Sequence, residues 1–509
     1  MKPSNELFDL IKSLTKSEKR FFKLSSSLQS GEKNYLKIFD FVDKQNSYDE
    51  DELKDEFKNE RFINHLPSEK NHLYKLILKS LRGFHSDNSI NSILKEEIKN
   101  VEILYKKSLY KECRKFLLRA KKTAEEHEKF YYWFELISWE KLLIEEDYEQ
   151  GNFNFDLDNL IQEELSVIEK LRNLAEYQMI YSRINYIFRS GGFVTRPDDI
   201  AAVDEISNHH LIIGKNTALS SSAASICYYI QGLCNATKRD FETALIKFNR
   251  TKEILDKKPK LKQDLAKRYV RTQHNLILAQ ISMGNYDEAT LLTAELDSMT
   301  GSKGFNTFDV KVKIFTCVYT SKITISYRKG DFQSTLKIVE EMIEGLESYG
   351  ERLPKEQVIL FSYHIAYVFY GAGLYRDSLK WVNTILNDNE QNLRQDIYSY
   401  TRIFNLILHY ELGNYDLLEY LMKSTTRQIK KNSKTEQVEL SILKFLKKVI
   451  RLGDKAKVKG FETYKEELDA ILKEENQSAI LEYFNVSAWV ESKIKNKSFE
   501  ETIKEMYIA

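Results

Sequence analysis

The amino-acid sequence predicts an all-α protein in which a small helical module, residues 1–88, precedes an α-solenoid of about ten helix-turn-helix repeats, residues 89–509. Three observations support this prediction. Only 5 Pro and 18 Gly interrupt the 509 residues, so long stretches rich in Leu, Ile, Lys and Glu remain free to form helices. The chain is too long for one ordinary core, yet 42% of its residues are hydrophobic and can bury much apolar surface. A repeat array buries that surface along its length without needing a single large core. The third observation is a turn that recurs at a nearly fixed interval.

The recurring turn has the form Gly-x-aromatic and is clearest at Gly284-Asn285-Tyr286. Glycine at the end of a helix accepts the left-handed conformation that terminates it, so this turn predicts the bend of a helical hairpin. The other clear copies are Gly151-Asn152-Phe153, Gly330-Asp331-Phe332, Gly373-Leu374-Tyr375 and Gly413-Asn414-Tyr415. Weaker copies are Ser108-Leu109-Tyr110, Arg239-Asp240-Phe241, Gly453-Asp454-Lys455 and Lys497-Ser498-Phe499.

Two further positions repeat with the same interval. The third residue after the aromatic is mostly small, which lets the two helices of a hairpin approach closely, and these residues are Cys113, Asp156, Ala244, Ala289, Thr335, Ser378, Leu418, Val458 and Thr502. The seventh is mostly apolar, and these residues are Leu117, Leu160, Phe248, Thr293, Val339, Val382, Met422, Glu462 and Met506. The wide gap between Phe153 and Phe241 has room for one degenerate turn near Arg196-Pro197. Irregular segments there predict a hinge over residues 190–222.

The pattern Gly284-Asn285-Tyr286 followed by Ala289 and Thr293 resembles the tetratricopeptide repeat (TPR). The resemblance covers roughly residues 90–509 and is clearest from 225 to 425, although the units are longer than the roughly 34 residues of that family. Of the family's consensus on the first helix, Gly232 alone is matched clearly. The composition, rich in Lys, Asn, Ile, Tyr and Phe, is similar to that of large helical-repeat proteins of AT-rich bacteria. The resemblance implies a right-handed superhelix whose concave face is lined by the first helix of each unit.

The concave face is also where the resemblance implies that a protein or peptide partner binds. Counting 15, 12, 8, 5 and 4 residues back from the turn aromatics gives a surface rich in tyrosine, which offers large contact area and a polar tip. The alternative is that these tyrosines pack between neighbouring units. The predicted groove residues are Tyr229, Arg271, His274, Tyr327, Arg328, Tyr363, Tyr367, Tyr370, Tyr400 and Tyr410. The first functional hypothesis is therefore a non-enzymatic scaffold or adaptor.

The N-terminal module lacks the repeated turn. A capping box, Thr15 to Glu18, begins one helix, and another helix can start at Pro67. Leu73, Ile77, Leu81 and Phe84 share one face of that later helix, and the opposite face carries Asn71, His72, Lys75, Lys79 and Arg82. A basic helix after a short helix suits a helix-turn-helix, so the alternative function is a DNA-binding sensor-regulator. The acidic segment 49–60 and the long connector favour instead a solvated helix face.

The remaining features bound the function. Lys and Arg number 77 against 76 for Asp and Glu, so nucleic acid could bind only through a local basic surface in the N-terminal module. Four scattered cysteines, no signal peptide and no apolar run long enough to span a membrane predict a cytoplasmic protein with no membrane partner. No nucleotide-binding, hydrolase or metalloprotease motif is present, and no residues have metal-ligand spacing. We therefore expect no enzyme activity, cofactor or metal.

Overall fold

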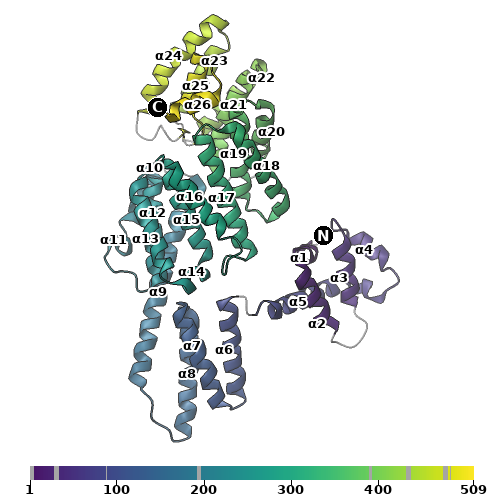
Figure 1. Ribbon diagram of the computed structural model, residues 1–509. Coiled ribbons are helices and arrows are strands. Elements are labelled where there is room, and N and C mark those ends of the chain that lie inside the picture. Colours follow the sequence, from purple (N-terminus) through teal and green to yellow (C-terminus); the bar gives the residue numbers. More distant parts are fainter. Residues whose placement is uncertain are drawn as a thin grey trace. The chain divides into compact units, whose positions relative to one another are not determined.

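The computed structural model describes residues 5–27, 34–86, 89–191, 197–388, 393–431, 437–473, 480–481 and 483–508. These residues form α-helices and two short 3-10 helices, with no strand among them (Figure 1). The all-α class predicted from the sequence is confirmed. Within the same ranges, every helix is too short or too polar to serve as a membrane span. Contacts divide the chain into two compact units, Met1–Glu164 and Leu165–Ala509, whereas the sequence placed a boundary at residue 88.

The first unit begins with a small bundle that has its own core. Leu7, Ile11, Phe39, Leu73 and Ile77 are buried together there, and the cluster extends no further along the described chain than Leu81. The capping box is confirmed, because the Glu18 amide donates to Thr15 Oγ1 at 3.3 Å and the Thr15 amide donates to Glu18 Oε2 at 2.6 Å. The helices are α1 (Glu6–Ser13), α2 (Lys16–Ser27), α3 (Asn34–Lys44), α4 (Glu50–Glu56), the 3-10 helix η1 (Arg61–His65) and α5 (Leu66–Phe84).

Three helices and the start of a fourth complete the first unit. They are α6 (Ile90–Lys106), α7 (Tyr110–Glu126), α8 (Phe130–Glu149) and α9 (Leu157–Gly191), of which residues 157–164 belong to this unit. Helix α7 packs against both α6 and α8. The Lys121 ammonium donates to Glu163 Oε2 at 2.9 Å, and the Trp133 indole donates to Glu163 Oε1 at 2.6 Å, so α9 begins anchored to α7 and α8.

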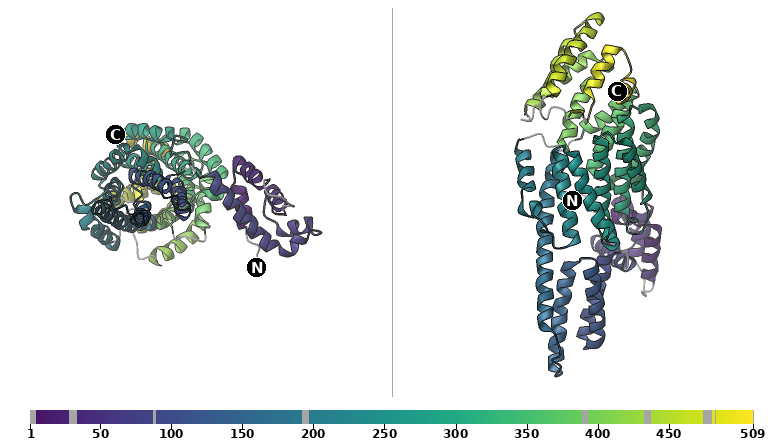
Figure 2. Two further views of the ribbon diagram at one scale, coloured as in Figure 1. Left: turned by 90° about the horizontal axis from the view of Figure 1, so that it is seen from below. Right: turned by 60° about the vertical axis from the view of Figure 1, so that its left-hand side comes forward.

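The second unit is a series of helical hairpins. From α15 onward, the first helix of each hairpin packs against the first helix of the next, through α17, α19 and α21 to α23. Before them, α15 packs against α13, the second helix of the preceding hairpin. In the left panel of Figure 2, the teal and green helices of this unit follow a curved path. After α9 the helices are α10 (Pro197–Ser207), α11 (His210–Ile213), α12 (Ser221–Thr237), α13 (Phe241–Asp256), α14 (Pro259–Asp264), α15 (Ala266–Ser282), α16 (Tyr286–Ser298), α17 (Phe308–Arg328), α18 (Phe332–Tyr349), η2 (Gly350–Arg352), α19 (Lys355–Gly371), α20 (Tyr375–Leu386), α21 (Gln395–Glu411), α22 (Tyr415–Lys431), α23 (Gln437–Val449), α24 (Asp454–Leu472), α25 (Val486–Lys495) and α26 (Phe499–Ile508).

The predicted turns coincide with the ends and starts of helices. Gly284 has φ +80°, in the left-handed region, and α16 begins two residues later at Tyr286. The glycines of the other four clear copies also have positive φ, between 72° and 82°, and Ser108 and Arg239 take the same conformation without being glycine. Gly453 is the exception, with φ −69° and ψ 158°. The degenerate turn near residues 196–197 falls partly outside the described residues, and α10 begins at Pro197.

The small and apolar positions after each turn are buried in most of the predicted hairpins. Gly232 shows how tight the packing is, since an added Cβ would lie 2.5 Å from the Phe248 ring. The predicted register is wrong in α24, where Val458 and Glu462 are exposed while Phe461 and Tyr464 are buried. Around Phe153, which is 70% exposed, the predicted aromatic plug is also wrong, because the ring stacks on Tyr148 at the surface.

The last two helices fold back over earlier hairpins. Phe499, the first residue of α26, contacts the Phe332 ring at 5.7 Å and the Tyr370 ring at 5.1 Å. Farther along α26, the Tyr507 ring lies 5.5 Å from the Tyr286 ring. A terminal unit of a simple array would contact only its neighbour, so this hairpin differs from the terminal repeat that the sequence predicted.

The segment predicted as a hinge contains both helices and anchored turns. Residues 192–196 lie outside the described residues. Farther on, Asn173 of α9 donates to the Thr217 carbonyl and accepts from the Leu219 amide, both at 3.0 Å. The Tyr177 hydroxyl, also on α9, donates to the Leu211 carbonyl at 2.8 Å. The stretch 211–219 is thus held against α9 by several hydrogen bonds.

Candidate ligand cavity

A cavity of about 260 Å³ lies inside the second unit. Its walls come from α9, α12, α13, α15, α17 and α19, together with Arg394 and Tyr483. Six of the ten predicted groove residues line it, and they are Tyr229, Arg271, His274, Tyr327, Arg328 and Tyr363. Counting back from the turn aromatics therefore located residues of one cavity from four different hairpins.

Helical spacing explains why these side chains converge. On α15, Arg271, His274, Leu278 and Ser282 are three or four residues apart, so they share one face of the helix. The same spacing on α17 aligns Thr320, Thr324, Tyr327 and Arg328, and on α19 it aligns Leu360, Tyr363 and His364. Because these first helices pack side by side, their shared faces form one continuous wall.

One side of the cavity is formed by a contact between distant parts of the unit. Arg189, near the end of α9, pairs with Glu356 at the start of α19. The Arg189 carbonyl also accepts a hydrogen bond from the Arg394 amide at 3.4 Å. Arg394 binds Asp396 through two donors, with Nη2 to Oδ2 at 2.7 Å and Nε to Oδ1 at 3.0 Å, and the Tyr483 hydroxyl donates to the same carboxylate.

Positive charge predominates along the cavity wall. Arg189 and Arg394 are each paired with a carboxylate, but no carboxylate in the described chain pairs with Arg271 or Lys313. The Arg271 guanidinium donates to the Tyr181 hydroxyl at 3.1 Å. Burial alone would raise the pKa of Asp396, yet the adjacent Arg394 charge holds that pKa below its usual value. Both Glu356 and Asp396 are therefore already neutralised by arginines.

Two histidines line the cavity in their neutral form. Burial lowers the pKa of His274 to about 3, and the positive charge of Lys313 lowers it further. Burial lowers the pKa of His364 to about 3 as well, with Arg394 and Arg328 contributing. Burial likewise raises the pKa of the nearby Cys317 thiol, although Lys313 and Arg271 oppose the rise. At neutral pH these side chains offer hydrogen-bonding groups without charge.

Several buried polar atoms of the cavity wall have no hydrogen-bond partner among the residues that the structure describes. The Tyr363 side chain is only 3% exposed and its hydroxyl is one of these atoms. The others are Arg271 Nε, His274 Nε2, Thr320 Oγ1 and His364 Nε2. Buried polar groups are nearly always hydrogen-bonded in folded proteins, so a concentration of this kind marks a place where a polar ligand or water completes the bonding.

The other four predicted groove residues are part of the core. Tyr367 and Tyr370 are 4% and 1% exposed and contact the rings of Phe404, Phe484 and Phe499. Tyr400 stacks on Tyr483 with ring centroids 4.3 Å apart, and the Tyr410 ring lies 6.0 Å from the Trp489 ring. For these four, the structure agrees with the alternative that the tyrosines pack within the array.

Sequence reasoning did not single out Lys313, His364, Arg394 and Tyr483. Lys313 lies one turn before the first position counted on α17, a helix of 21 residues that is longer than its neighbours. His364 directly follows the counted Tyr363. Arg394 and Tyr483 lie outside the first helices, in segments that no repeat rule reaches.

The predicted nucleic-acid residues lie together on α5. Asn71, His72, Lys75, Lys79 and Arg82 are all exposed. The His72 ring contacts the Tyr35 ring at 5.9 Å, whereas Lys75, Lys79 and Arg82 take part in no ion pair within the described ranges. The helix buries Leu73 and Ile77 on its other face, against the bundle core.

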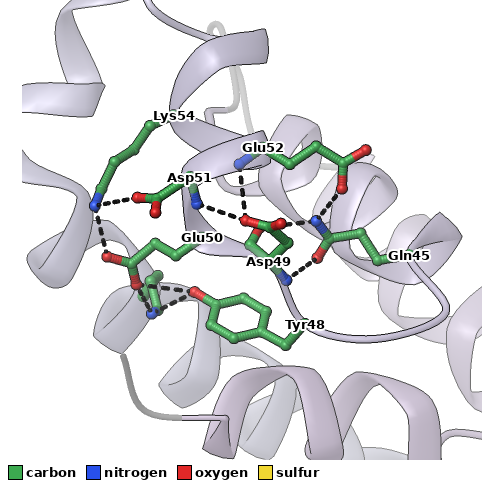
Figure 3. Close-up of polar contacts among 8 residues, drawn as sticks. Gln45, Tyr48, Asp49, Glu50, Asp51, Glu52 and Lys54 are labelled. Atoms are coloured by element: carbon green, nitrogen blue, oxygen red, sulfur yellow. Dashed lines mark hydrogen bonds and ion pairs between the residues drawn. The ribbon is translucent and has the colours of Figure 1, made fainter. Parts of the chain in front are cut away.

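Figure 3 shows that acidic side chains of the segment before α5 form hydrogen bonds and ion pairs with neighbouring residues of the same module. The Asp49 carboxylate caps α4 by accepting from the Asp51 and Glu52 amides at 2.9 and 3.0 Å. Glu50 pairs with Lys70 at 2.7 Å and with Lys54 at 3.1 Å. Burial would raise the pKa of Glu50, but hydrogen bonds from these lysines lower it to about 2. The Glu50 charge, which is part of the acidic segment that would repel phosphate, is thus compensated within the module.

A search of the described ranges finds no cluster of His, Cys, Asp and Glu that could hold a metal ion. The four cysteines are free and buried. No model of a known protein family matches the chain, and no curated protein matches it.

Proposed function

We propose that the chain is a non-enzymatic adaptor with a TPR-like superhelical array, and that it binds a short peptide segment of a protein partner on the inner face. One observation supports this above the others. Side chains at the predicted concave positions of consecutive first helices surround a common cavity, and several of their polar atoms have no partner among the described residues. Repeat arrays present extended inner surfaces for such partners.

The dimensions of the cavity favour a short segment. Ligand sites in proteins usually occupy roughly 300–1,000 Å³, and about 260 Å³ is slightly below that range. Leu233, Leu278, Ile281 and Leu360 supply apolar surface beside the tyrosines and charged groups. An amphipathic stretch of a few residues suits these walls better than a folded domain.

The chemistry of the wall and of the groups next to it favours binding over catalysis. A thiol whose pKa is raised, as in Cys317, is a weak nucleophile. Glu356 and Asp396 are paired with arginines, and a paired carboxylate is a poor general base. The proposed activity is therefore recognition of a partner.

A bulky side chain at the rim of the cavity tests this function. Ser282 lines the cavity and is exposed, so Ser282→Trp should occupy the site without overpacking the core. Full-length protein would be mixed with a pool of random pentapeptides, and the retained peptides identified by mass spectrometry after ultrafiltration. We expect the wild-type protein and the control Ser298→Trp, on the exposed surface of α16, to retain peptides that Ser282→Trp loses. Equal retention by both tryptophan variants would reject the inner-face site.

The second candidate function is DNA binding by the N-terminal module. The exposed cations Lys75, Lys79 and Arg82 on one face of α5 favour it. Gel-shift assays on the full chain would compare the triple alanine variant of these residues with the control Lys111→Ala, Lys115→Ala, Lys122→Ala, which removes equal charge from exposed sites on α7. Three lost phosphate contacts should reduce the dependence of log K on log salt by about 3. Binding that is absent, or equal in both variants, would eliminate this candidate.

A further inference from the structure

Two cations on neighbouring first helices face the cavity without a carboxylate partner. Arg271 is on α15 and Lys313 is on α17, and both are half-buried. Their charges act on the same buried thiol, since each opposes the rise in the pKa of Cys317. A charge that is partly removed from water costs free energy unless an opposite charge compensates it. The two cations of this site therefore lack the negative charge that would compensate them, because no described protein group supplies it.

Uncharged hydrogen-bonding groups surround the two cations. The Tyr363 hydroxyl is a donor without a partner in the described chain, and it lies at the same wall as His364 Nε2 and Thr320 Oγ1. Tyr363, His364 and Thr320 are each more than nine-tenths buried, with exposures of 3%, 8% and 4%. A hydroxyl of this kind beside positively charged groups is suited to donate to an anionic oxygen.

Neither the carboxylate that lines the cavity, Glu356, nor the one bound to its lining residue Arg394, Asp396, opposes an incoming anion. Glu356 is bound by Arg189, and Asp396 is bound by Arg394 and by the Tyr483 hydroxyl. Arg328 adds a further positive side chain to the wall. Guanidinium groups match carboxylate and phosphate oxygens through paired N–H donors, whereas an ammonium supplies a compact charge.

We propose that the cavity recognises an anionic oxygen group, a carboxylate or a phosphate, carried by the bound peptide. Arg271 and Lys313 hold the anion, the Tyr363 hydroxyl donates to it, and Leu278 and Leu360 contact the apolar part of the ligand. This inference rests on the proposed peptide-binding function and specifies its ligand as an acidic or phosphorylated segment.

The test compares two peptide pools on the full-length protein. One pool contains random pentapeptides with free C termini, and the other is amidated at the C terminus with Asn and Gln in place of Asp and Glu. The wild-type protein should retain the acidic pool selectively. Arg271→Gln and Lys313→Gln should each weaken that retention by about 10- to 100-fold, the usual effect of losing a hydrogen bond to a charged group. A third arm measures thermal unfolding in inorganic phosphate against chloride of equal ionic strength.

Matched variants separate a cavity effect from a general loss of charge. Lys311→Gln removes an exposed lysine from the same helix as Lys313, and Arg250→Gln removes an exposed arginine from α13. Both should bind as the wild-type protein does. Selective stabilisation by phosphate that only Arg271→Gln and Lys313→Gln abolish would identify a phosphate as the preferred anion.

The outcomes distinguish this inference from the function on which it rests. If both pools are retained equally, Arg271→Gln and Lys313→Gln bind normally and Ser282→Trp does not, the peptide function stands and the anion inference is wrong. If neither pool binds but phosphate stabilises the wild-type protein and not Arg271→Gln, the anion site stands and the peptide function is wrong. If no probe binds, both are rejected.

Discussion

Arg189 and Glu356 form an ion pair although 167 residues separate them in the chain. The first residue is near the end of α9 and the second is at the start of α19, so the contact joins the beginning of the second unit to its later hairpins. Both side chains also line the cavity. The pair therefore couples closure of the unit to the shape of the candidate site.

Breaking this pair should cost stability in a way that depends on both residues. Arg189 is 36% exposed and Glu356 12%, which makes the pair intermediate between surface and buried cases. A double-mutant cycle with Arg189→Gln and Glu356→Gln should give a coupling free energy of about 1 kcal/mol in chemical denaturation. The exposed pair Arg172 and Glu176, within α9, should give less than half of that. A coupling no larger than that of the control would mean that the closing contact is not maintained in solution.

Removing the Tyr363 hydroxyl should leave the ligand-free protein as stable as before or stabilise it by about 1 kcal/mol. The reason is that Tyr363→Phe deletes a buried hydroxyl that no described group satisfies. The control is Tyr464→Phe, because the Tyr464 hydroxyl shares a 3.0 Å hydrogen bond with Ser441 Oγ and its loss should cost about 1 kcal/mol. Urea unfolding of both variants measures the difference. Equal losses would show that the Tyr363 hydroxyl has a partner in solution.

Protonation of His364 should destabilise the fold as the pH falls. Its pKa is about 3 in the folded chain against 6.5 for an ordinary histidine, so below pH 6.5 the unfolded state binds the proton that the folded state excludes. Stability is then lost by up to about 1.4 kcal/mol per pH unit between pH 6 and pH 4. His364→Gln should remove this contribution and make the profile less steep over that window, while His274, whose pKa is also about 3, keeps its own contribution. His210→Gln, at an exposed site, should keep the wild-type profile. Parallel profiles for all three proteins would contradict the burial of a neutral His364.

Phe499 should be essential to the second unit, whereas Phe153 should not matter for stability. Phe499 is 5% exposed and contacts Phe332, Tyr367 and Tyr370, so Phe499→Ala should cost about 3–5 kcal/mol. Phe153→Ala should change stability by less than about 0.5 kcal/mol, because that ring is 70% exposed. Both residues are the aromatic residue of a predicted turn, so they differ in burial but not in sequence pattern. Thermal unfolding of the two variants therefore measures the effect of burial alone. Similar losses would contradict the packing of α26 against α18.

The sequence predicted local geometry better than packing. Five of the six glycines placed at the turn have positive φ, because that conformation depends mainly on the few residues at a helix end. Gly453 and the register of α24 deviate, since an x-Gly-Asp turn can also serve as the start of the next helix. Phe153 could not be identified as exposed, because nothing local distinguishes it from the buried Phe332.

The cavity was partly predictable for the same reason. Residues such as Arg271 and Tyr363 share helix faces at a regular spacing, which counting from the turn could find. The burial of Tyr367 and Tyr370 depends on Phe484 and Phe499, which lie more than a hundred residues later in the chain. The sequence around Phe499 predicts only one more hairpin of the array and gives no sign of this contact. Pairing between distant segments leaves no periodic signal in either of them.

The return of α26 to the starts of α16 and α18 has a consequence for how the chain is made. During translation, Tyr367 and Tyr370 leave the ribosome long before Phe484 and Phe499 are available to cover them. The second unit therefore cannot complete its core by adding one hairpin at a time, as short-range repeat arrays do. Its final consolidation is a late, non-local event, and until then an aromatic surface is open to chaperones or to aggregation.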